Sequence, residues 1–457
     1  MSLVNIALSG LNANRVALEI TAQNVANVNT VGYSRQQAVH AAIGSGTYDR
    51  LSPGSGVEVT SIRRVTEQFL VKQTWLTNSL AGYASSYTNN MSQLENTLSA
   101  DGFSISAGLD TLFTSLNDAT VKPESIPYRQ QIINESEALS HRFHTLSQSL
   151  HHQHKDISDQ QNAAILHANS LMSNIADTNK QIAEMQGTGG NPAQLLDARD
   201  ALIGELAQVL EVRTTDQPDG TLQVTLASGQ PLVIGAEAAK LKAIPDPADP
   251  YMADLQVEFG KQNFAISHAV GGKLGALVDY QHDVLKPNQR ALDDMAQSLA
   301  DEFNHILATG KDLNANTGKP LFQYDPTNPA ASLSITDIQP EELAFSEDGT
   351  PGNSDVLSHL IELSNKAVSV TGYGSLSLND AFTAMVGQTA IKARQTTADF
   401  DAKTTMNKQA IAARDNVSAV NSDEEAANLM VFINAHNANM KVISKANELF
   451  DSVLQLV

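Results

Sequence analysis

Residues Asp423 to Val457, DEEAANLMVFINAHNANMKVISKANELFDSVLQLV, form the stretch that decides the fold of this chain. Its apolar side chains follow alternating steps of 4 and 3 once two polar members, His436 and Asn447, are included. Such heptad spacing keeps one stripe of a helix turned toward a partner helix over many turns. No Gly or Pro interrupts the stretch, and its acidic head, Ser422 to Glu425, fits a capping box. The stripe consists of Leu429, Ile433, Met440, Ile443, Phe450, Leu454 and Val457, widened by Phe432, Ala446 and Val453.

A second amphipathic helix is predicted at the other end of the chain. Its stripe has the same spacing, with Arg15 as the one charged member. The apolar members are Val4, Leu8, Leu11, Leu18, Ala22 and Val25. Each helix carries more apolar surface than it can cover by itself, so we expect the two to pair as a coiled coil. The pattern alone leaves open whether this pair builds an assembly or closes one globular domain.

Four blocks of the sequence resemble one known family. Residues 24–36, NVANVNTVGYSRQ, resemble the N-terminal signature of the bacterial flagellar axial proteins of the rod, hook and hook-associated group. Residues 423–451, from DEEAANL to ANELFD, are similar to the tail of the hook-associated protein 1 family within that group. Residues 8–13 (LSGLNA) and 195–200 (LLDARD) also resemble this family, and the order of the blocks agrees. Two departures are noted: Val31 stands where the family usually has Pro, and Ile433, Asn434 and His436 stand in a tail segment where the family commonly has Gln and Tyr.

The resemblance implies a structural protein of the flagellum. It implies a ring of copies of this chain at the extracellular hook–filament junction, between the hook protein and the second junction protein. It also implies export by the flagellar type III apparatus without a cleaved signal peptide, with a dedicated chaperone on the C-terminal helix. Longer relatives carry a further outer domain near 310–352, and its absence or reduction accounts for the short chain. The expected assembly interface consists of Val4, Leu8, Leu11, Leu18, Val25, Asn27, Asn29, Gly32, Tyr33, Leu429, Phe432, Ile433, Met440, Ile443, Phe450 and Leu454.

The composition narrows the classes of function. Asp and Glu outnumber Lys and Arg by 50 to 29, which gives a formal charge of −21, so nucleic acids and anionic membranes are poor partners. The absence of cysteine excludes disulfides, thiol catalysis and cysteine zinc sites. No apolar run is long enough to span a membrane, and the first residues lack the pattern of a cleaved secretory signal. By themselves the residues indicate a cytoplasmic protein, whereas the resemblance implies an exported one.

The periodicity predicts a mainly α fold: a long helical rod with paired terminal helices and a small inserted β domain. The longest helical pattern runs from about Arg129 to Met185, roughly 85 Å if unbroken. Period-two patterning marks the β domain, which we expect to project from the rod, with Pro245, Pro247 and Pro250 in a connector between two hairpins. Pro287 is expected to kink or interrupt a later helix. The expected parts are 1–33 and 421–457 for the terminal coiled coil, 34–210 and 272–420 for the rod, and 211–271 for the β domain.

Histidines on the long predicted helix are the cluster that most suggests chemistry. His151 and His154, at i and i+3, have the spacing of a shared metal site, but the chain contains no HExxH motif and no thiolate. We therefore interpret the cluster as a solvated helix face, without a metal or cofactor. Residues 312–323 begin like a calcium loop, but Thr317 and Gln323 occupy positions that require Gly and Glu. We expect a polar turn there.

No phosphate loop or nucleophile elbow marks an enzyme, so no catalysis is expected. Two other classes of function stay open: a non-flagellar soluble coiled-coil scaffold, and a lyase or peptidase carried on the β insertion. If the chain assembles, both terminal helices should be mobile in the monomer and become ordered on assembly. The physical reason is that their apolar faces have few partners within one chain.

Overall fold

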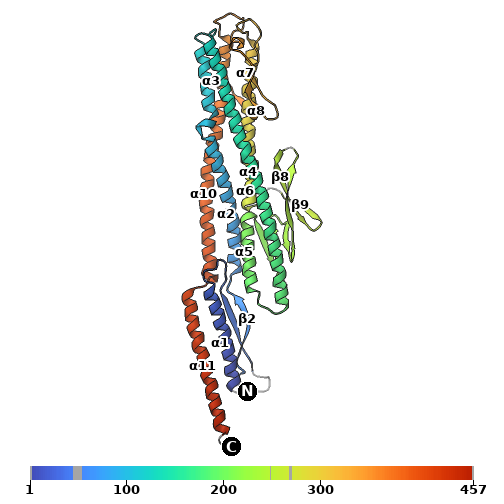
Figure 1. Cartoon of the computed structure of the whole chain (residues 1–457), viewed down its shortest axis with the longest axis vertical. Coiled ribbons are helices and arrows are strands. Elements are labelled where there is room, and N and C mark those ends of the chain that lie inside the picture. Colours follow the sequence, from blue (N-terminus) through green and yellow to red (C-terminus); the bar gives the residue numbers. More distant parts are fainter. Residues whose placement is uncertain (1–2, 45–53, 248, 267–269, 455–457) are drawn as a thin grey trace.

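A computed structural model shows the chain as an elongated helical rod with a smaller unit at one end (Figure 1). The structure describes residues 3–44, 54–247, 249–266 and 270–454; Val457 of the predicted stripe lies outside these residues, as does the side chain of Val453. The smaller unit, here called the terminal unit, contains both ends of the described chain. It comprises α1 (Leu3–Ala26), the hairpin strands β1 (Gln36–Ala42) and β2 (Val57–Arg64), and α11 (Ser422–Leu454). The predicted mainly α class is confirmed.

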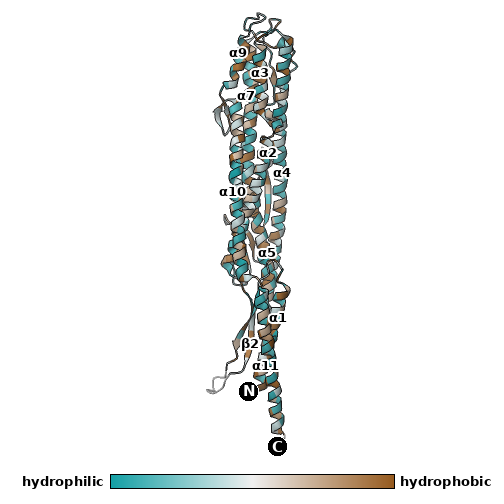
Figure 2. Ribbon diagram, turned by 90° about the vertical axis from the view of Figure 1, so that its left-hand side faces the viewer, coloured by the Kyte–Doolittle hydropathy of each residue, from teal (hydrophilic) through white to brown (hydrophobic). Residues whose placement is uncertain are grey.

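The rod is a bundle of long helices that lie side by side along its axis (Figures 1 and 2). Its longest helix, α4 (Ile126–Gly187), has 62 residues and is therefore about 93 Å long. The other long helices are α2 (Gln68–Leu98), α3 (Ile105–Ala119), α7 (Lys286–Thr309) and α10 (Leu378–Ser418). The apolar stripe that predicts α4 is fully buried among them, from Leu139 through Phe143 to Ile157. Burial of this stripe along several turns holds the bundle together.

Prolines and serines set several helix boundaries in the rod. Ser104 and Ser377 each accept a hydrogen bond from a backbone N–H of the next turn and so cap α3 and α10. The interruption predicted at Pro287 is present as a π-helical turn (Gln281–Leu285) between α6 (Gly272–Tyr280) and α7. The remaining elements are η1 (Asp101–Phe103), α5 (Ala193–Val209), β10 (Phe322–Gln323), α8 (Pro329–Ser332), β11 (Ser334–Ile335), η3 (Pro340–Glu342), α9 (Asp355–Glu362), η4 (Leu363–Asn365), β12 (Val368–Val370) and β13 (Gly374–Leu376).

The β segment is present where period-two patterning predicts it, in two antiparallel sheets ordered β3-β4-β5-β6 and β7-β8-β9. Its strands are β3 (Val212–Asp216), β4 (Leu222–Leu226), β5 (Pro231–Ile234), β6 (Glu237–Ala238), β7 (Lys240–Asp246), β8 (Asp249–Phe259) and β9 (Gln262–Ile266). The predicted connector is wrong, because Pro245 lies inside β7, opposite Ala253 of β8. Proline is tolerated there because β7 is an edge strand.

The β segment shares a core with the rod and does not project as an independent domain. Val224 of β4 belongs to the same apolar cluster as Ile175 of α4 and Leu206 of α5. The side-chain amide of Asn179 on α4 also donates a hydrogen bond to the carbonyl of Leu222 (2.9 Å). Sheets of three or four short strands have too little apolar surface for a core of their own, so they bury one face against the helices.

Removal of residues 211–270, with the ends joined by a short Gly/Ser link, is expected to unfold the half of the rod next to the terminal unit. The deletion would expose Ile175, Leu206 and their neighbours, and each buried aliphatic side chain contributes about 1.5–3 kcal/mol. Circular dichroism should show a loss of helical signal and a lower melting temperature. A deletion variant that keeps the helical melt of the full chain would contradict the shared core.

One histidine of α4 is buried, contrary to the predicted solvated face. His141, His151 and His152 are exposed, whereas His154 is only 2 % exposed. His154 packs against the π-helical turn, where the side-chain amide nitrogen of Gln281 lies 3.3 Å from its Nδ1. Burial lowers the pKa of His154 to about 4. Among the described residues, no three His, Asp or Glu side chains are grouped closely enough to hold a metal ion.

Acidification from about pH 6.5 to about pH 4 is expected to destabilise the protein through His154. The unfolded chain gains a proton on this imidazole near pH 6.5, but the folded chain does so only near pH 4. The contribution of the neutral ring to stability is therefore fully present above about pH 6.5, the pKa in the unfolded chain. It is lost as the pH falls from there to about 4, and the total loss in the free energy of unfolding is about 3 kcal/mol. Thermal melts should show a smaller acid-induced loss of stability in His154→Gln than in the natural chain.

The comparison with His154→Gln is needed because Asp293 acts in the opposite direction. Burial raises the pKa of this carboxyl to about 6, so the folded state binds its proton more tightly and gains stability as the pH falls. The natural chain and His154→Gln share this effect, and it cancels in their difference. Equal losses of stability on acidification in both proteins would contradict the role assigned to His154.

The polar turn expected at residues 312–323 is present. Asp312 is 4 % exposed, and its Oδ1 accepts hydrogen bonds from the N–H groups of Asn314 and Asn316, both at 2.8 Å. The carboxylate therefore closes a local turn of its own chain.

Candidate functional site: the paired terminal helices

The helices α1 and α11 lie antiparallel to each other and extend beyond the end of the rod (Figures 1 and 2). Near the rod, Asn24 of α1 contacts Glu425 of α11. Further along, Gly10 lies against Asn439, so closely that a Cβ added at Gly10 would be 2.9 Å from the Asn439 side-chain nitrogen. The two ends of the chain are thus paired, as the sequence predicts.

The contact between the two helices includes only part of the predicted stripes and adds other residues. On α1 the buried positions are mostly small or polar: Ala7, Ala13, Ala17, Ile20, Thr21 and Asn24. On α11 the buried or half-buried positions are Glu425, Asn428, Phe432, Ala435, His436, Asn439, Ile443 and Ala446. Five of them lie one residue before a member of the predicted heptad, whereas His436 and Ile443 are members of it. One residue is about 100° around a helix. Small side chains allow close approach of the two helices, which larger aliphatic ones would prevent.

Five apolar members of the predicted α11 stripe lie outside the contact between the two helices. Leu429, Ile433, Met440, Phe450 and Leu454 are all exposed, Phe450 by 64 %. Among the described residues, twelve of the 24 exposed large apolar side chains belong to α1 and α11. We refer to these twelve together as the outer apolar face, although on α11 they lie on more than one side of the helix: Leu3, Leu8, Val25, Leu429, Met430, Val431, Ile433, Met440, Val442, Leu449, Phe450 and Leu454. An apolar surface of this extent marks a place of interaction.

The other apolar residues of the expected interface are half-buried: Val4, Leu11, Leu18, Phe432 and Ile443. Leu8 and Val25 belong to the outer apolar face. Within the described ranges, no helix combines the length and apolar character that crossing a membrane requires.

The turn that follows α1 contains the four remaining residues of the expected interface. Gly32 has φ +82°, which a type II turn requires at its third position, and Val31 at the second position is 96 % exposed. Pro is common at that second position but is not required there, so Val31 is compatible with the turn. Asn29 is exposed, and Asn27 is half-buried and donates a side-chain hydrogen bond to the preceding helical turn. Tyr33 is half-buried and turns back toward α1.

Asn24 joins α1, β1 and α11 and was not among the predicted interface residues. Its Nδ2 donates to the Gln36 carbonyl (3.0 Å) and to Glu425 Oε2 (3.2 Å). Its Oδ1 accepts from the Gln36 N–H and the Tyr33 hydroxyl, both at 3.0 Å. Burial raises the pKa of Tyr33 to about 12, and the carboxylates of Asp197 and Glu425 add to the rise. The hydroxyl therefore stays protonated and remains a donor to Asn24.

The acidic head of α11 has a different role from the predicted capping box. The cap is Asn421, whose Oδ1 accepts hydrogen bonds from the N–H groups of Asp423 (2.9 Å) and Glu424 (3.4 Å). Ser422 is already inside the helix. Glu424 pairs with Arg35 at 2.5 Å, while the neighbouring Glu425 turns inward to Asn24. These carboxylates therefore tie α11 to the start of β1.

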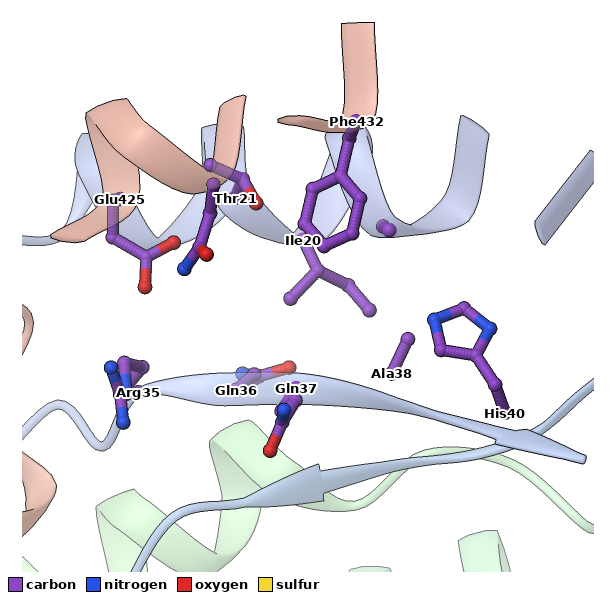
Figure 3. A pocket seen from close by; sticks show the side chains of 11 residues that line it. Ile20, Thr21, Arg35, Gln36, Gln37, Ala38, His40, Glu425 and Phe432 are labelled. Carbon is purple, nitrogen blue, oxygen red and sulfur yellow. The ribbon is translucent and has the colours of Figure 1, made fainter. Parts of the chain in front are cut away.

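A groove of about 300 Å³ separates the helix pair from β1 (Figure 3). Figure 3 shows Ile20 of α1 and Phe432 of α11 lining it on the helix side, with Ala38 and His40 on the strand side. Glu425 and Arg35 lie toward one end. The mixture of apolar and polar groups resembles the lining of a protein–protein contact.

Comparisons with known proteins match both the terminal unit and the rod. The family of flagella basal body rod proteins matches residues 5–33, and the C-terminal region of the flagellar basal body rod FlgEFG proteins matches residues 414–456. The paired terminal helices therefore define a flagellar axial protein. The helical domain of flagellar hook-associated protein FlgK matches residues 91–322, half of the chain. The chain belongs to the flagellar hook-associated protein FlgK family.

Relatives match over nearly the whole chain. Flagellar hook-associated protein 1 of Salmonella typhimurium strain LT2 is 27 % identical over 556 aligned positions, which cover 100 % of both chains. The protein of the same name from Bacillus subtilis strain 168 is 25 % identical and covers 98 % of this chain and 96 % of its own. The flagellar hook junction protein FlgK of Burkholderia pseudomallei has the same fold, with a TM-score of 0.69 and 16 % identity over 76 % of this chain and all of its own.

Family membership makes this chain a structural component of the bacterial flagellum that assembles with other axial components. It also decides against the non-flagellar scaffold that the coiled-coil pattern had left open.

Proposed function

We propose that copies of this chain form the ring that joins the flagellar hook to the filament, as the names of its relatives suggest. The observation that carries the proposal is the outer apolar face, which nothing within the described chain covers. Neighbouring copies would cover it by laying their terminal units side by side. The chain then acts as a structural adaptor and performs no catalysis.

The energetics support association through this face. Full burial of a fully exposed Val, Leu, Ile, Phe or Met side chain contributes about 1.5–3 kcal/mol, and twelve such side chains, each already partly covered, are available in each copy. The loss of translational and rotational freedom on association costs on the order of 4–15 kcal/mol. Burial of the larger part of the face therefore exceeds this cost. A copy that meets only one neighbour buries less, which favours closed assemblies over pairs.

The partners we propose follow the order of parts in the flagellum. The hook protein would lie below the ring and the second hook–filament junction protein above it. Before export by the flagellar type III apparatus, a dedicated chaperone would cover the apolar residues of α11. The terminal coiled coil (1–33 and 421–457 in the proposed division), which is the terminal unit without its β1–β2 hairpin, would form the inner tube. The helical rod (34–210 and 272–420) and the β segment (211–271) would form the shells around that tube.

A strain that lacks this chain is expected to carry hooks without filaments and to release flagellin into the medium. The reason is that filament subunits would have no adaptor on which to assemble. Electron microscopy of the cells and flagellin immunoblots of the medium measure the two effects, and a plasmid copy of the natural chain should reverse both. Filaments of normal number and length in the deletion strain would contradict the proposed function.

A further inference from the structure

Two short connections join the terminal unit to the rod: residues 65–67 lead from β2 to α2, and residues 419–421 lead from α10 to α11. Connections of this length, by themselves, would allow the unit to swing about an axis through them. Packing does not fill the joint, since a cavity of about 220 Å³ lies between residues 31–34 and the helices α2, α5 and α10. The angle between unit and rod therefore depends on specific polar contacts.

The strongest of these contacts is made by Arg64, the last residue of β2. Its Nη1 lies 2.9 Å from Asp197 Oδ1, and its Nη2 lies 2.7 Å from Asp200 Oδ2. The three side chains are only 6 %, 10 % and 17 % exposed. Asp197 Oδ2 also accepts a hydrogen bond from the backbone N–H of Ser34 (3.2 Å), just before β1. Helix α5 of the rod therefore binds the terminal hairpin at two places, just before β1 begins and where β2 ends.

The geometry of this contact fixes the direction in which the terminal unit leaves the rod, and not only its attachment to the rod. Asp197 and Asp200, three residues apart on α5, present two carboxylates on one face of the helix. The planar guanidinium of Arg64 reaches both at once through different nitrogens, which fixes its direction as well as its distance. Burial raises the pKa of Asp197 even though Arg64 acts against the rise. Such desolvated ion pairs add little net stability but can specify one arrangement over others.

We propose that Arg64, Asp197 and Asp200 form an orienting latch that fixes the angle of the terminal unit on the rod within a single chain. Arg64 is a positioning residue in this account, because it acts through the placement of the hairpin β1–β2 and of α1, which packs against that hairpin. The inference concerns the isolated chain and does not rest on the proposed junction function.

Distance measurements between spin labels test the latch directly, and the absence of natural cysteine makes labelling specific. One label pair, Asn162→Cys in α4 and Ser444→Cys in α11, spans the joint. A second pair, Asn12→Cys in α1 and Asn437→Cys in α11, lies within the terminal unit. All four positions are exposed, so the labels should not disturb packing. Pulsed electron paramagnetic resonance then gives a distance distribution for each pair.

The latch predicts that Arg64→Met broadens the distribution across the joint to about twice its natural width or more, while the pair within the terminal unit keeps its distribution. Arg64→Lys should give a distribution across the joint that is narrower than that of Arg64→Met, because the lysine keeps one charged contact. Lys72→Met is the matched control, since it breaks an exposed ion pair with Asp216 on the same side of the chain, and it should leave both distributions unchanged.

Arg64→Met leaves two carboxylates without their partner and for that reason could fail to fold. Asp200→Ala is the variant for that case. It removes the more exposed partner and should broaden the distribution across the joint to a smaller extent. The latch would be overturned if every variant that folds showed a distance distribution across the joint as narrow as that of the natural chain. Equal broadening within the terminal unit would overturn it too, because the effect would then be general loosening.

Discussion

Replacement of Phe450 by Asp is expected to abolish filament attachment while leaving the monomer folded. Phe450 is 64 % exposed in the single chain, so its loss costs the monomer little. In an assembly that covers the outer apolar face, the new carboxylate would be buried without a partner, at a cost of several kcal/mol. Cells that carry the variant should release flagellin, and Ile433→Asp should have the same effect. The purified variants should melt close to the natural chain.

The matched control is Leu166→Asp on α4, which makes the same kind of change at a leucine that is 70 % exposed on the rod. It should support normal filaments. The exported Phe450→Asp chain should also appear in the medium, which separates a failure of assembly from a failure of export. Normal filaments on both Phe450→Asp and Ile433→Asp would remove the outer apolar face from the interface.

Amide hydrogen exchange in α11 is expected to slow by about 100-fold or more when the chain assembles. In the monomer, Glu425 and Ala446 are the buried side chains among those described in this 33-residue helix, so local opening should cost little free energy. Burial of the outer apolar face in the assembly would raise the free energy of this local opening. The amides of α4 around Phe143 provide the internal control, since they are deeply buried and should be protected in both states. Equally slow exchange of α11 in the monomer would contradict ordering on assembly.

The pairing of the two chain ends could be predicted from sequence, but only some of the residues in contact could, among them Phe432 and Ala446. Heptad spacing shows which side of a helix is apolar and leaves open what that side touches. In this chain the apolar sides, with Leu429 and Ile433, lie outside, and the inner contact uses Gly10, Ala17 and Asn439. A chain that assembles can reserve its apolar stripe for other subunits, because small residues are enough to hold its own two helices together.

The error at His154 arose from treating neighbouring histidines as one surface. Leu150, His154 and Ile157 follow steps of 4 and 3, so the periodicity that predicts the buried stripe of α4 already included this residue. The position of each histidine on the helix should have taken precedence over its chemical type.

The contacts at the joint between the terminal unit and the rod could not be predicted from sequence, for a different reason. Asn24, Asp197 and Glu425 all lie in the blocks that resemble the flagellar family, so their importance could be suspected. The contact of Asn24 with Glu425 joins residues 401 positions apart, and no local pattern records such a pairing. The shared core of the β segment was missed for the same reason, since period-two patterning shows a buried face but not the helices that cover it.

The most direct test of the central claim is electron cryomicroscopy of the intact hook–filament junction at a resolution that shows side chains. The account predicts a ring of this chain in which Leu429, Ile433, Met440 and Phe450 of each copy are buried against neighbouring terminal units. It would be contradicted by a ring in which the outer apolar face borders open solvent and copies meet only through their rods.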